Sequence, residues 1–469
     1  MEGRMQKILR DKNYPSKDRT ESERQVGVQT FLWITKNSLT NTNQSLVGLL
    51  EQILSPDNLS LAYQQVQRNK GSGGIDGMQV TDLHGYLIKY GEALIFRLLS
   101  GKYIPNPVLR VEIPKDNKGK RQLGIPTVID RVIQQSISQI LTQIYDPCFS
   151  TYSYGFRPKR NAHQALKQCQ DFISSGYSYI VDLDLSKFFD TVSHCKLIEV
   201  LSRKVKDGRV LSLIHKYLNA GVYVGGDYKS SELGVPQGGP LSPLLGNIML
   251  NELDKELEMR GHKFVRYADD LVIFCKSKRS SERVMKSITK FIEGKLYLKV
   301  NKEKSQVAPF YGVKFLGYSF YKNHKREVRL RIHPKSVSKM KSKIKLLTSR
   351  SNGWGTAKRK ESLRQYIVGW VNYFKLADMQ KLLSRVDEWY RRRIRMIIWK
   401  HWKRIRTKVR NLVKLGVKKS KAFEWANTRK SYWHIANSFI LKTTITKTLL
   451  RKAGYLFLSD YYQKVRVKT

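Results

Sequence analysis

Two runs of the chain combine strand-forming apolar residues with acidic ones. In the run 264–274, Asp269 and Asp270 stand side by side with apolar residues before and after them. Val, Ile, Phe and Tyr dominate both flanks, so the pattern predicts a β-hairpin with the acidic pair at its tip. A solvated Asp-Asp turn is the plainer interpretation, and a second acidic run upstream counts against it.

That second run covers residues 179–190. Alternation of apolar and polar positions places Asp182 and Asp184 on one face of a predicted strand, with apolar residues on the other. Asp190 follows shortly afterwards. Of these acids Asp184 is the candidate for chemistry, while Asp182 or Asp190 can instead cap a helix that begins near 191–193.

Adjacent carboxylates repel each other, and burial strengthens the repulsion. A divalent cation removes this conflict, and Mg²⁺ prefers oxygen ligands such as carboxylates and phosphates. Enzymes that transfer phosphoryl groups grip two metal ions about 4 Å apart with carboxylates from separate strands. Asp184, Asp269 and Asp270 suit such a polymerase site.

Hydrophobic periodicity elsewhere predicts mostly helices. The expected helical ranges are two helices within 38–70, then 127–146, 161–174, 194–220, 244–258 and 280–293. A strand over 103–115 and a return strand over 121–126 form a predicted hairpin, and 349–355 is a predicted connection between helices.

Three loops are candidates for nucleotide contacts. The hairpin carries Lys115, Lys118, Lys120 and Arg121, which can fold over a triphosphate or simply face solvent. Gln237 stands in a rigid Gly/Pro loop and is placed for a polar contact, although a purely structural loop stays open. The glycine-rich stretch 69–77 is a weak phosphate cradle, because it lacks the full spacing of such motifs.

Charge adds a polyanionic partner to this picture. The net charge is +49 and the pI about 10.1, which favours salt-sensitive binding to nucleic acid. After residue 330, Lys and Arg outnumber Asp and Glu by 37 to 6, and seven of the eight Trp residues lie there. The cationic candidates in basic aromatic stretches are Arg157, Arg391, Arg392, Arg393, Arg395, Lys400, Arg429 and Lys430.

Other compositional features set the compartment. The four cysteines have no paired CxxC spacing, which argues against a disulfide framework or a structural zinc site and fits a reducing compartment. No run of 18 apolar residues occurs, and residues 1–7 contain no apolar signal core. We therefore expect a bacterial cytoplasmic protein, with an organelle less favoured.

The order of these motifs resembles the group II intron reverse transcriptase/maturase family, from about residue 40 to the end. The most specific stretches are Ser153–Pro158, Gly234–Pro243 and Tyr267–Asp270. The resemblance implies an α+β right-hand polymerase, with fingers and an antiparallel palm sheet, followed by an α-helical thumb and a short basic region.

The resemblance also implies roles for single residues. Asp184, Asp269 and Asp270, with Leu185 beside them, match the site for two Mg²⁺ ions, for which Mn²⁺ can substitute. Lys115, Arg121, Gln237 and Lys304 match the nucleotide pocket, and Phe189 matches the gate against a ribose 2′-hydroxyl. Primer and template contacts match Arg157, Tyr267, Leu316 and Gly317.

The implied domains are a polar tail (1–37), fingers and palm (38–330), a thumb or maturase domain (331–425) and a DNA-binding-like region (426–469). Longer family members carry a C-terminal endonuclease with paired cysteines, and no cysteine follows Cys275 here. We therefore expect an endonuclease-lacking form that does not cleave the second DNA strand and takes primers from elsewhere.

The expected function is RNA-directed DNA synthesis, combined with binding and splicing of a parent intron RNA and with intron mobility by target-primed reverse transcription. The expected partners are intron RNA, target DNA, primer and dNTPs, without a membrane. Two alternatives stay open: a splicing-only maturase, and a reverse transcriptase of a retron or defence system. Intact Asp184, Asp269 and Asp270 count against the first, and the basic region after 330 counts against the second.

Overall fold

The computed structural model describes residues 48–114 and 119–467. The chain divides into two compact units. The first comprises the segments up to Asn161, Leu183–Leu271 and Arg283–Gln306, and the second comprises Ala162–Asp182, Val272–Glu282 and Val307 onward. The predicted tail 1–37 and Lys115 lie outside the described residues.

The N-terminal part of the first unit is helical. It contains α3 (Leu49–Ile53), α4 (Pro56–Asn69), α5 (Leu83–Leu99) and α6 (Val128–Tyr145). Pro56 opens α4, where its missing N–H has no partner to lose, and the Thr127 side chain caps α6 by accepting from the Asp130 amide. Of these helices α5 was not predicted, although its buried residues recur at helical spacing.

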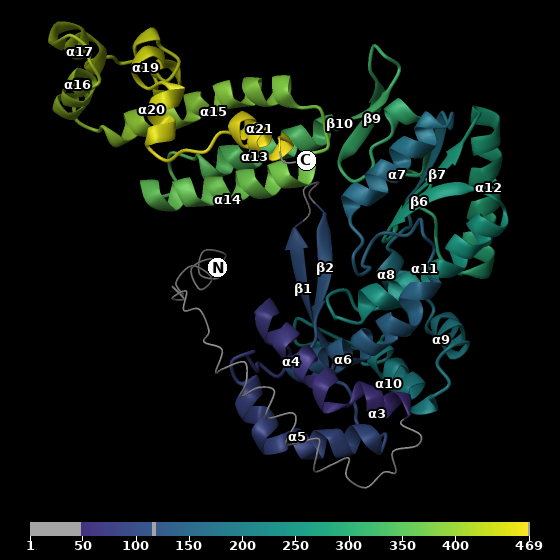
Figure 1. Cartoon of the computed structure of the whole chain (residues 1–469). Coiled ribbons are helices and arrows are strands. Elements are labelled where there is room, and N and C mark those ends of the chain that lie inside the picture. The colour runs from purple at the N-terminus through teal and green to yellow at the C-terminus, as the bar shows by residue number, and fades with distance from the viewer. Residues whose placement is uncertain (1–47, 115–118, 468–469) are drawn as a thin grey trace. The chain divides into compact units, whose positions relative to one another are not determined.

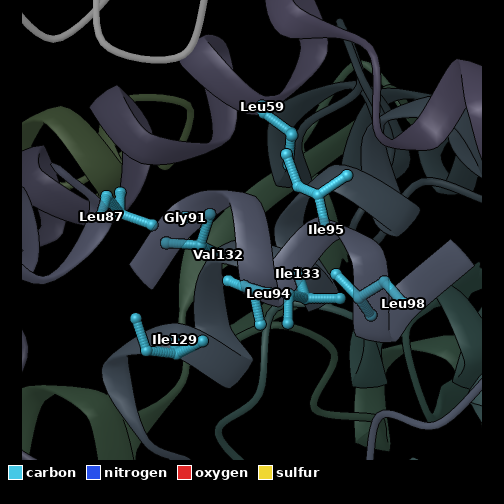
Figure 2. A pocket seen from close by; sticks show the side chains of 9 residues that line it. All are labelled: Leu59, Leu87, Gly91, Leu94, Ile95, Leu98, Ile129, Val132 and Ile133. Carbon is cyan, nitrogen blue, oxygen red and sulfur yellow. The ribbon is translucent and has the colours of Figure 1, made fainter. Parts of the chain in front are cut away.

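Helices α4, α5 and α6 enclose a small apolar cavity (Figure 2). Its lining consists of Leu59, Leu87, Gly91, Leu94, Ile95, Leu98, Ile129, Val132 and Ile133. No polar side chain lines it, and an apolar space of this kind stays dry. The cavity is therefore a packing feature of the helical layer and offers nothing to a charged substrate.

The predicted basic hairpin is present as β1 (Val108–Pro114) and β2 (Lys120–Ile125), which pair antiparallel (Figure 1). The first strand begins at residue 108 rather than 103, because Pro105 and Pro107 cannot donate to a ladder. Strands β4 (Val222–Val224) and β5 (Asp227–Lys229), which were not predicted, complete a sheet of order β2-β1-β4-β5.

A second four-stranded sheet has the order β6-β7-β3-β8. Its strands are β3 (Tyr179–Leu183), β6 (Lys263–Tyr267), β7 (Asp270–Cys275) and β8 (Gln306–Pro309). The helices α7 (Ala162–Ser174), α11 (Ser242–Met259) and α12 (Lys278–Lys295) agree with the predicted helical ranges to within two residues at each end. Every residue of β7 after Asp270 is buried, as in strands covered on both faces.

The predicted helix over 194–220 is two helices, α9 (His194–Ser202) and α10 (Gly208–Leu218), after the short α8 (Phe188–Thr191). The Ser193 side chain caps α9 by accepting from the Lys196 amide, and Asp207 caps α10. The expectation that Asp182 or Asp190 caps this helix is therefore wrong, because the chain places a Ser at the capping position.

The second unit contains the hairpin β9 (Tyr318–Lys322) and β10 (Val328–Ile332), followed by helices. The long helices α13 (Pro334–Leu347), α14 (Thr356–Phe374) and α15 (Gln380–His401) lie side by side (Figure 1). Residues 349–355 connect α13 to α14, as predicted. The remaining helices are α16 (Ile405–Lys414), α17 (Lys419–Ala426), α18 (Tyr432–Ile435), α19 (Phe439–Thr444), α20 (Lys447–Lys452) and α21 (Leu458–Arg466).

The mainly antiparallel sheets and the C-terminal helical region confirm the predicted α+β class. No helix among residues 48–114 and 119–467 is long and apolar enough to cross a membrane.

A buried carboxylate joins the last helix to α15. Asp387 is 1% exposed and accepts from the Leu458 amide (3.0 Å), the Ser459 amide (2.9 Å) and the Ser459 hydroxyl (2.6 Å). Burial raises the pKa of the Asp387 carboxyl, and these three donors oppose the rise. Asp387 thereby satisfies the first backbone donors of α21.

We expect Asp387→Ala to lower the free energy of unfolding by about 3 kcal/mol, because it leaves buried amides without an acceptor. Urea unfolding followed by tryptophan fluorescence measures this, since seven of the eight Trp residues lie after residue 330. The control is Asp378→Ala, which removes a partly exposed ion pair with Arg466 and an exposed hydrogen bond from the Tyr321 hydroxyl and costs about 1 kcal/mol. Equal losses in the two variants would contradict the role given to Asp387.

Candidate active site

The predicted acidic hairpin is present. Strand β6 ends at Tyr267 and β7 begins at Asp270, so only Ala268 and Asp269 connect them. Ala268 has φ of +58°, a left-handed conformation that costs a non-glycine residue about 1–2 kcal/mol. Asp269 and Asp270 are both exposed, so neither residue is buried in the core.

A neighbouring segment fixes the backbone of this turn. The Arg266 amide donates to the Tyr152 carbonyl and the Tyr154 amide donates to the Arg266 carbonyl, both at 2.9 Å. A Cβ added to Gly155 would lie 2.2 Å from the Ala268 nitrogen. The stretch containing Gly155 therefore lies directly against the acidic turn, and only glycine permits this approach.

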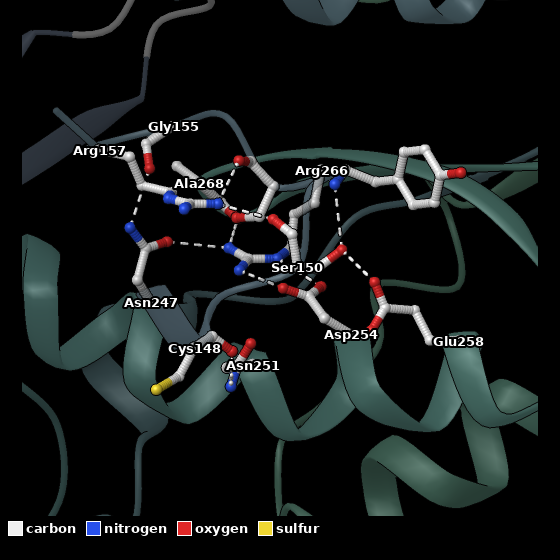
Figure 3. A network of polar contacts seen from close by, with 12 residues as sticks. Cys148, Ser150, Gly155, Arg157, Asn247, Asn251, Asp254, Glu258, Arg266 and Ala268 are labelled. Carbon is white, nitrogen blue, oxygen red and sulfur yellow. Dashed lines mark hydrogen bonds and ion pairs between the residues drawn. The ribbon is translucent and has the colours of Figure 1, made fainter. Parts of the chain in front are cut away.

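Arg157 belongs to the same stretch, but its guanidinium points inward (Figure 3). It forms an ion pair with Asp146 (2.7 Å) and donates to the carbonyls of Ser150 (2.6 Å), Ser153 (3.0 Å) and Asp146 (2.9 Å). Its side chain is 5% exposed. The expectation that Arg157 contacts primer or template needs correction, because internal acceptors already occupy its donors.

Asp184 follows the last residue of β3. Its amide donates to the Ser305 hydroxyl (3.1 Å), and its carbonyl accepts from the Asn301 amide (2.8 Å). Lys304 Nζ lies 3.4 Å from Asp184 Oδ2. The structure therefore places Lys304, which the resemblance matched to the nucleotide pocket, next to the Asp184 carboxylate. Ser305 was missed, since a lone Ser in a polar loop gives no signal.

The donor set has the chemistry that magnesium prefers, since Asp184, Asp269 and Asp270 offer only carboxylate oxygens. In the described part of the chain, no three His, Cys, Asp or Glu side chains gather closely enough to hold a metal ion. The Asp184 carboxylate is instead paired with Lys304. Leu185 is buried and its backbone pairs with Val300, which holds the segment that carries Asp184.

Phe189 is half-buried in α8 and packs edge-on against Phe188, with ring centroids 5.0 Å apart. A Cβ on Gly246 of α11 would lie 3.2 Å from the Phe189 ring. The Val235 amide also donates to the Phe189 carbonyl (2.6 Å). The predicted gate residue is thus held between a helix and the Gly/Pro loop.

The Gly/Pro loop joins the basic hairpin at Gln237. The Gly124 amide of β2 donates to the Gln237 carbonyl at 2.6 Å, and a Cβ on Gly238 would lie 2.2 Å from the Gly124 carbonyl oxygen. Arg121 lies in the same strand and pairs in register with Ile113. Two predicted nucleotide-binding elements therefore meet, while Lys115 lies outside the described residues.

Leu316 and Gly317 form a tight turn in the second unit. Their φ angles are +49° and +83°, and Phe315 and Tyr318 exchange backbone hydrogen bonds across them (3.0 and 2.9 Å). The Gly317 carbonyl accepts from the Ser336 hydroxyl at 2.9 Å. The predicted primer-grip residues thus sit on a turn that side chains of the second unit stabilise.

The predicted basic residues of α15 divide into buried and half-buried groups. Arg393 and Arg395 are 9% and 6% exposed and donate to carbonyls such as Thr348 (3.1 Å) and Ile445 (3.0 Å). Their expected contact with nucleic acid needs correction, since they hold helices together. Arg392 stacks on Trp433, with its guanidinium carbon 3.9 Å from the ring centroid.

The remaining basic candidates reach the surface to different degrees. Arg391 is half-buried, and half-buried Lys400 donates to the Arg350 carbonyl at 2.6 Å. Arg429 and Lys430 are exposed in the connection after α17. Those two residues are the predicted cations best placed to meet a phosphate.

Comparisons with known proteins agree with this arrangement. A model described as reverse transcriptase (RNA-dependent DNA polymerase) matches residues 113–320, and a model of the group II intron maturase-specific domain matches residues 337–416. Protein YkfC of Escherichia coli is 33% identical over 334 residues, which cover 62% of this chain and 88% of YkfC.

Two intron-encoded proteins are also similar. The group II intron-encoded protein LtrA of Lactococcus lactis is 30% identical over 400 residues, which cover 71% of this chain and 65% of LtrA. The COX1/OXI3 intron 2 protein of Saccharomyces cerevisiae is 30% identical over 341 residues, covering 60% of this chain and 39% of that protein. The matched region is thus less than two thirds of either relative.

The contact at Gly155 is testable by adding a single methyl group. We expect Gly155→Ala to lower the free energy of unfolding by about 1–3 kcal/mol, because the backbone at Ala268 cannot move aside cheaply. Gly85→Ala is the control, since a Cβ there meets nothing within 4 Å and alanine favours the helix. Thermal unfolding followed by circular dichroism measures both, and an equal effect in the two variants would contradict the close approach.

Proposed function

This chain belongs to the group II intron-encoded reverse transcriptase/maturase family, and on that premise we propose that it copies RNA into DNA while binding and helping to splice its parent intron RNA. Membership confirms the resemblance drawn from the motifs. The observation that carries the polymerase activity is the exposed pair Asp269 and Asp270 on a turn whose backbone is fixed. A reverse transcriptase without an intron is not favoured, because the maturase model matches residues 337–416.

A reverse transcriptase domain implies dependence on divalent metal ions in general. In our proposal, Asp184, Asp269 and Asp270, with Leu185 beside them, hold two Mg²⁺ ions, and Mn²⁺ can replace them. Such ions activate the attacking hydroxyl and neutralise the charge of the leaving group. Three carboxylates with hard oxygen donors support this assignment, although the sequence and not the geometry singles out the set.

The chemistry is a substitution at phosphorus. The primer 3′-hydroxyl oxygen bonds to the α-phosphorus of a dNTP, the bond to the bridging oxygen breaks, and pyrophosphate leaves. The protein contributes mainly by positioning and electrostatics. Lys304, 3.4 Å from Asp184, supplies positive charge next to the carboxylate, and it offsets the charge of an incoming triphosphate.

Other residues shape the nucleotide pocket in this proposal. Arg121 and Lys115 bind the triphosphate from the basic hairpin, and Gln237 contacts the nucleotide from the loop that supports that hairpin. Phe189 excludes a ribose 2′-hydroxyl, and its contacts with α11 and with the Gly/Pro loop favour a fixed ring. Tyr267, at the end of β6, and the turn at Leu316 and Gly317 contact primer and template.

Intron RNA and target DNA are the proposed partners of the basic region. We assign residues 331–425 to the thumb or maturase domain and 426–469 to a DNA-binding region, with fingers and palm before them. Arg429 and Lys430 are exposed, and Arg391, Arg392 and Lys400 are partly so. Phosphate contacts of this kind give affinity without reading sequence, so shape selects the RNA. Intron mobility then follows from target-primed reverse transcription.

Asp269→Asn is expected to reduce DNA synthesis by at least about a thousandfold, because removing a charged group that acts on the transition state costs several kcal/mol. Binding of the RNA template and primer is expected to stay within twofold. Primer extension with dNTPs and Mg²⁺ measures the first, and filter binding measures the second. Asp190→Asn, which alters an exposed carboxylate of α8, is the control, and equal activity in both variants would contradict the assignment.

Removing Arg429 and Lys430 together by Ala substitution is expected to weaken RNA binding and to reduce the salt slope of log affinity by about two, one for each lost phosphate contact. The control combines Lys196→Ala on α9 with Arg203→Ala at the C-terminal cap of that helix, since both cations already pair with Glu199. Affinity measured over a range of KCl concentrations decides this. An unchanged slope would remove Arg429 and Lys430 from the RNA surface.

A further inference from the structure

A buried ion pair lies directly beneath the acidic turn. Arg266 is 1% exposed, although only Tyr267 separates it from the turn, and Asp254 of α11 is fully buried. Arg266 Nε and Nη2 donate to the two Asp254 carboxylate oxygens at 2.7 and 2.5 Å. This bidentate ion pair fixes the plane of the guanidinium.

The remaining face of the guanidinium holds the turn itself (Figure 3). Arg266 Nη1 donates to the Ala268 carbonyl at 3.0 Å and to Asn247 Oδ1 at 2.9 Å. Ala268 is the residue in the left-handed conformation, and it directly precedes Asp269. The Arg266 side chain therefore folds forward over its own strand and binds the strained residue.

Asn247 extends this grip to the opposite side of the turn. Its Nδ2 donates to the Gly155 carbonyl at 2.8 Å, and Gly155 lies against the Ala268 nitrogen. Both sides of Ala268 are thus connected to α11, which carries Asn247 and Asp254. A residue other than glycine keeps a left-handed conformation only where neighbouring contacts fix its backbone. Here the contacts with Arg266 and Gly155 do so.

Stability alone does not account for a charged pair at this position. Buried ion pairs can often be replaced by apolar residues without loss, because desolvation offsets the attraction. An apolar side chain, however, cannot donate to the Ala268 carbonyl. What the pair adds is a directed hydrogen bond to the residue that orients Asp269 and Asp270.

We propose that Arg266 and Asp254 are positioning residues of the active site: they hold the backbone of the turn so that Asp269 and Asp270 present their oxygens to divalent metal ions. The inference rests on the proposed polymerase function. Mg²⁺ demands near-ideal octahedral geometry at short distances, so a small shift of the turn weakens metal binding while the fold and the RNA surface stay intact.

Three variants of the full chain test the proposal. Arg266→Lys keeps the positive charge but cannot form the bidentate ion pair. Asp254→Asn keeps the shape of the side chain but removes its negative charge. The double variant Asp254→Leu with Arg266→Met replaces the pair by apolar residues and keeps the core filled. The matched control is Glu256→Gln, which removes the charge of a partly exposed ion pair with Arg260 at the C-terminal end of the same helix.

Two readouts separate positioning from folding. Mn²⁺ titration followed by electron paramagnetic resonance, with RNA template and DNA primer bound, measures metal affinity without catalysis. Primer extension over a range of Mg²⁺ measures the half-saturating concentration. We expect both values to rise about tenfold in Arg266→Lys and in the double variant, and to rise in Asp254→Asn, while Glu256→Gln stays within twofold of the native chain.

Template affinity and cooperative melting are expected to stay native-like in the double variant. A folded double variant with native Mn²⁺ affinity would overturn the proposal. Loss of cooperative melting in all three variants would also overturn it, since the pair would then serve the fold as a whole. If the native chain made no DNA yet bound Mn²⁺ more tightly than the variants, the polymerase function would fail and the positioning role would stand.

Discussion

The constraint on which the acidic site depends is the fixed backbone of the turn that carries two adjacent carboxylates. Asp269 and Asp270 are exposed, so water screens their charges, and the fold leaves them outside the core. The turn that exposes them has a strained backbone, because Ala268 adopts a left-handed conformation. The Arg266 guanidinium binds the carbonyl of Ala268, and Gly155 packs against its nitrogen. The end of β6, helix α11 and the segment that contains Gly155 therefore all stabilise one two-residue turn.

Positive charge has two separate uses in this chain. Exposed cations provide the polyanion surface that a net charge of +49 implies, while several arginines work inside the protein. Arg157, Arg266, Arg393 and Arg395 all donate to backbone carbonyls. A guanidinium offers five donors in a rigid plane, so one side chain can donate hydrogen bonds to backbone carbonyls of two segments at once. Basic composition therefore overstates the binding surface.

Local features of the site were predictable because their signals are local. Apolar flanks around an acidic pair indicated the hairpin at Asp269, and Pro and Gly marked the loop at Gln237. Distant contacts were not predictable, since the sequence around Arg266 does not indicate that Asp254 is its partner. Arg393 and Arg395 were misjudged for a related reason: basic residues of an amphipathic helix can face carbonyls of neighbouring helices as readily as solvent. A single Arg within a buried strand is the signal that merited a search for a partner.

The bond between Gly124 and Gln237 makes the basic hairpin an arm with a fixed base. Gly124 pairs with Arg110, and the ladder continues outward to Pro114 and Lys120. Four strand residues span about 13 Å, so the arm length is set by the number of paired residues beyond the base. Inserting two residue pairs, which keeps each distal side chain on its original face, would carry the distal cations outward by about 7 Å and leave Gln237 in place. In the proposed polymerase, the reach of the hairpin toward a triphosphate and the position of Gln237 can therefore change independently.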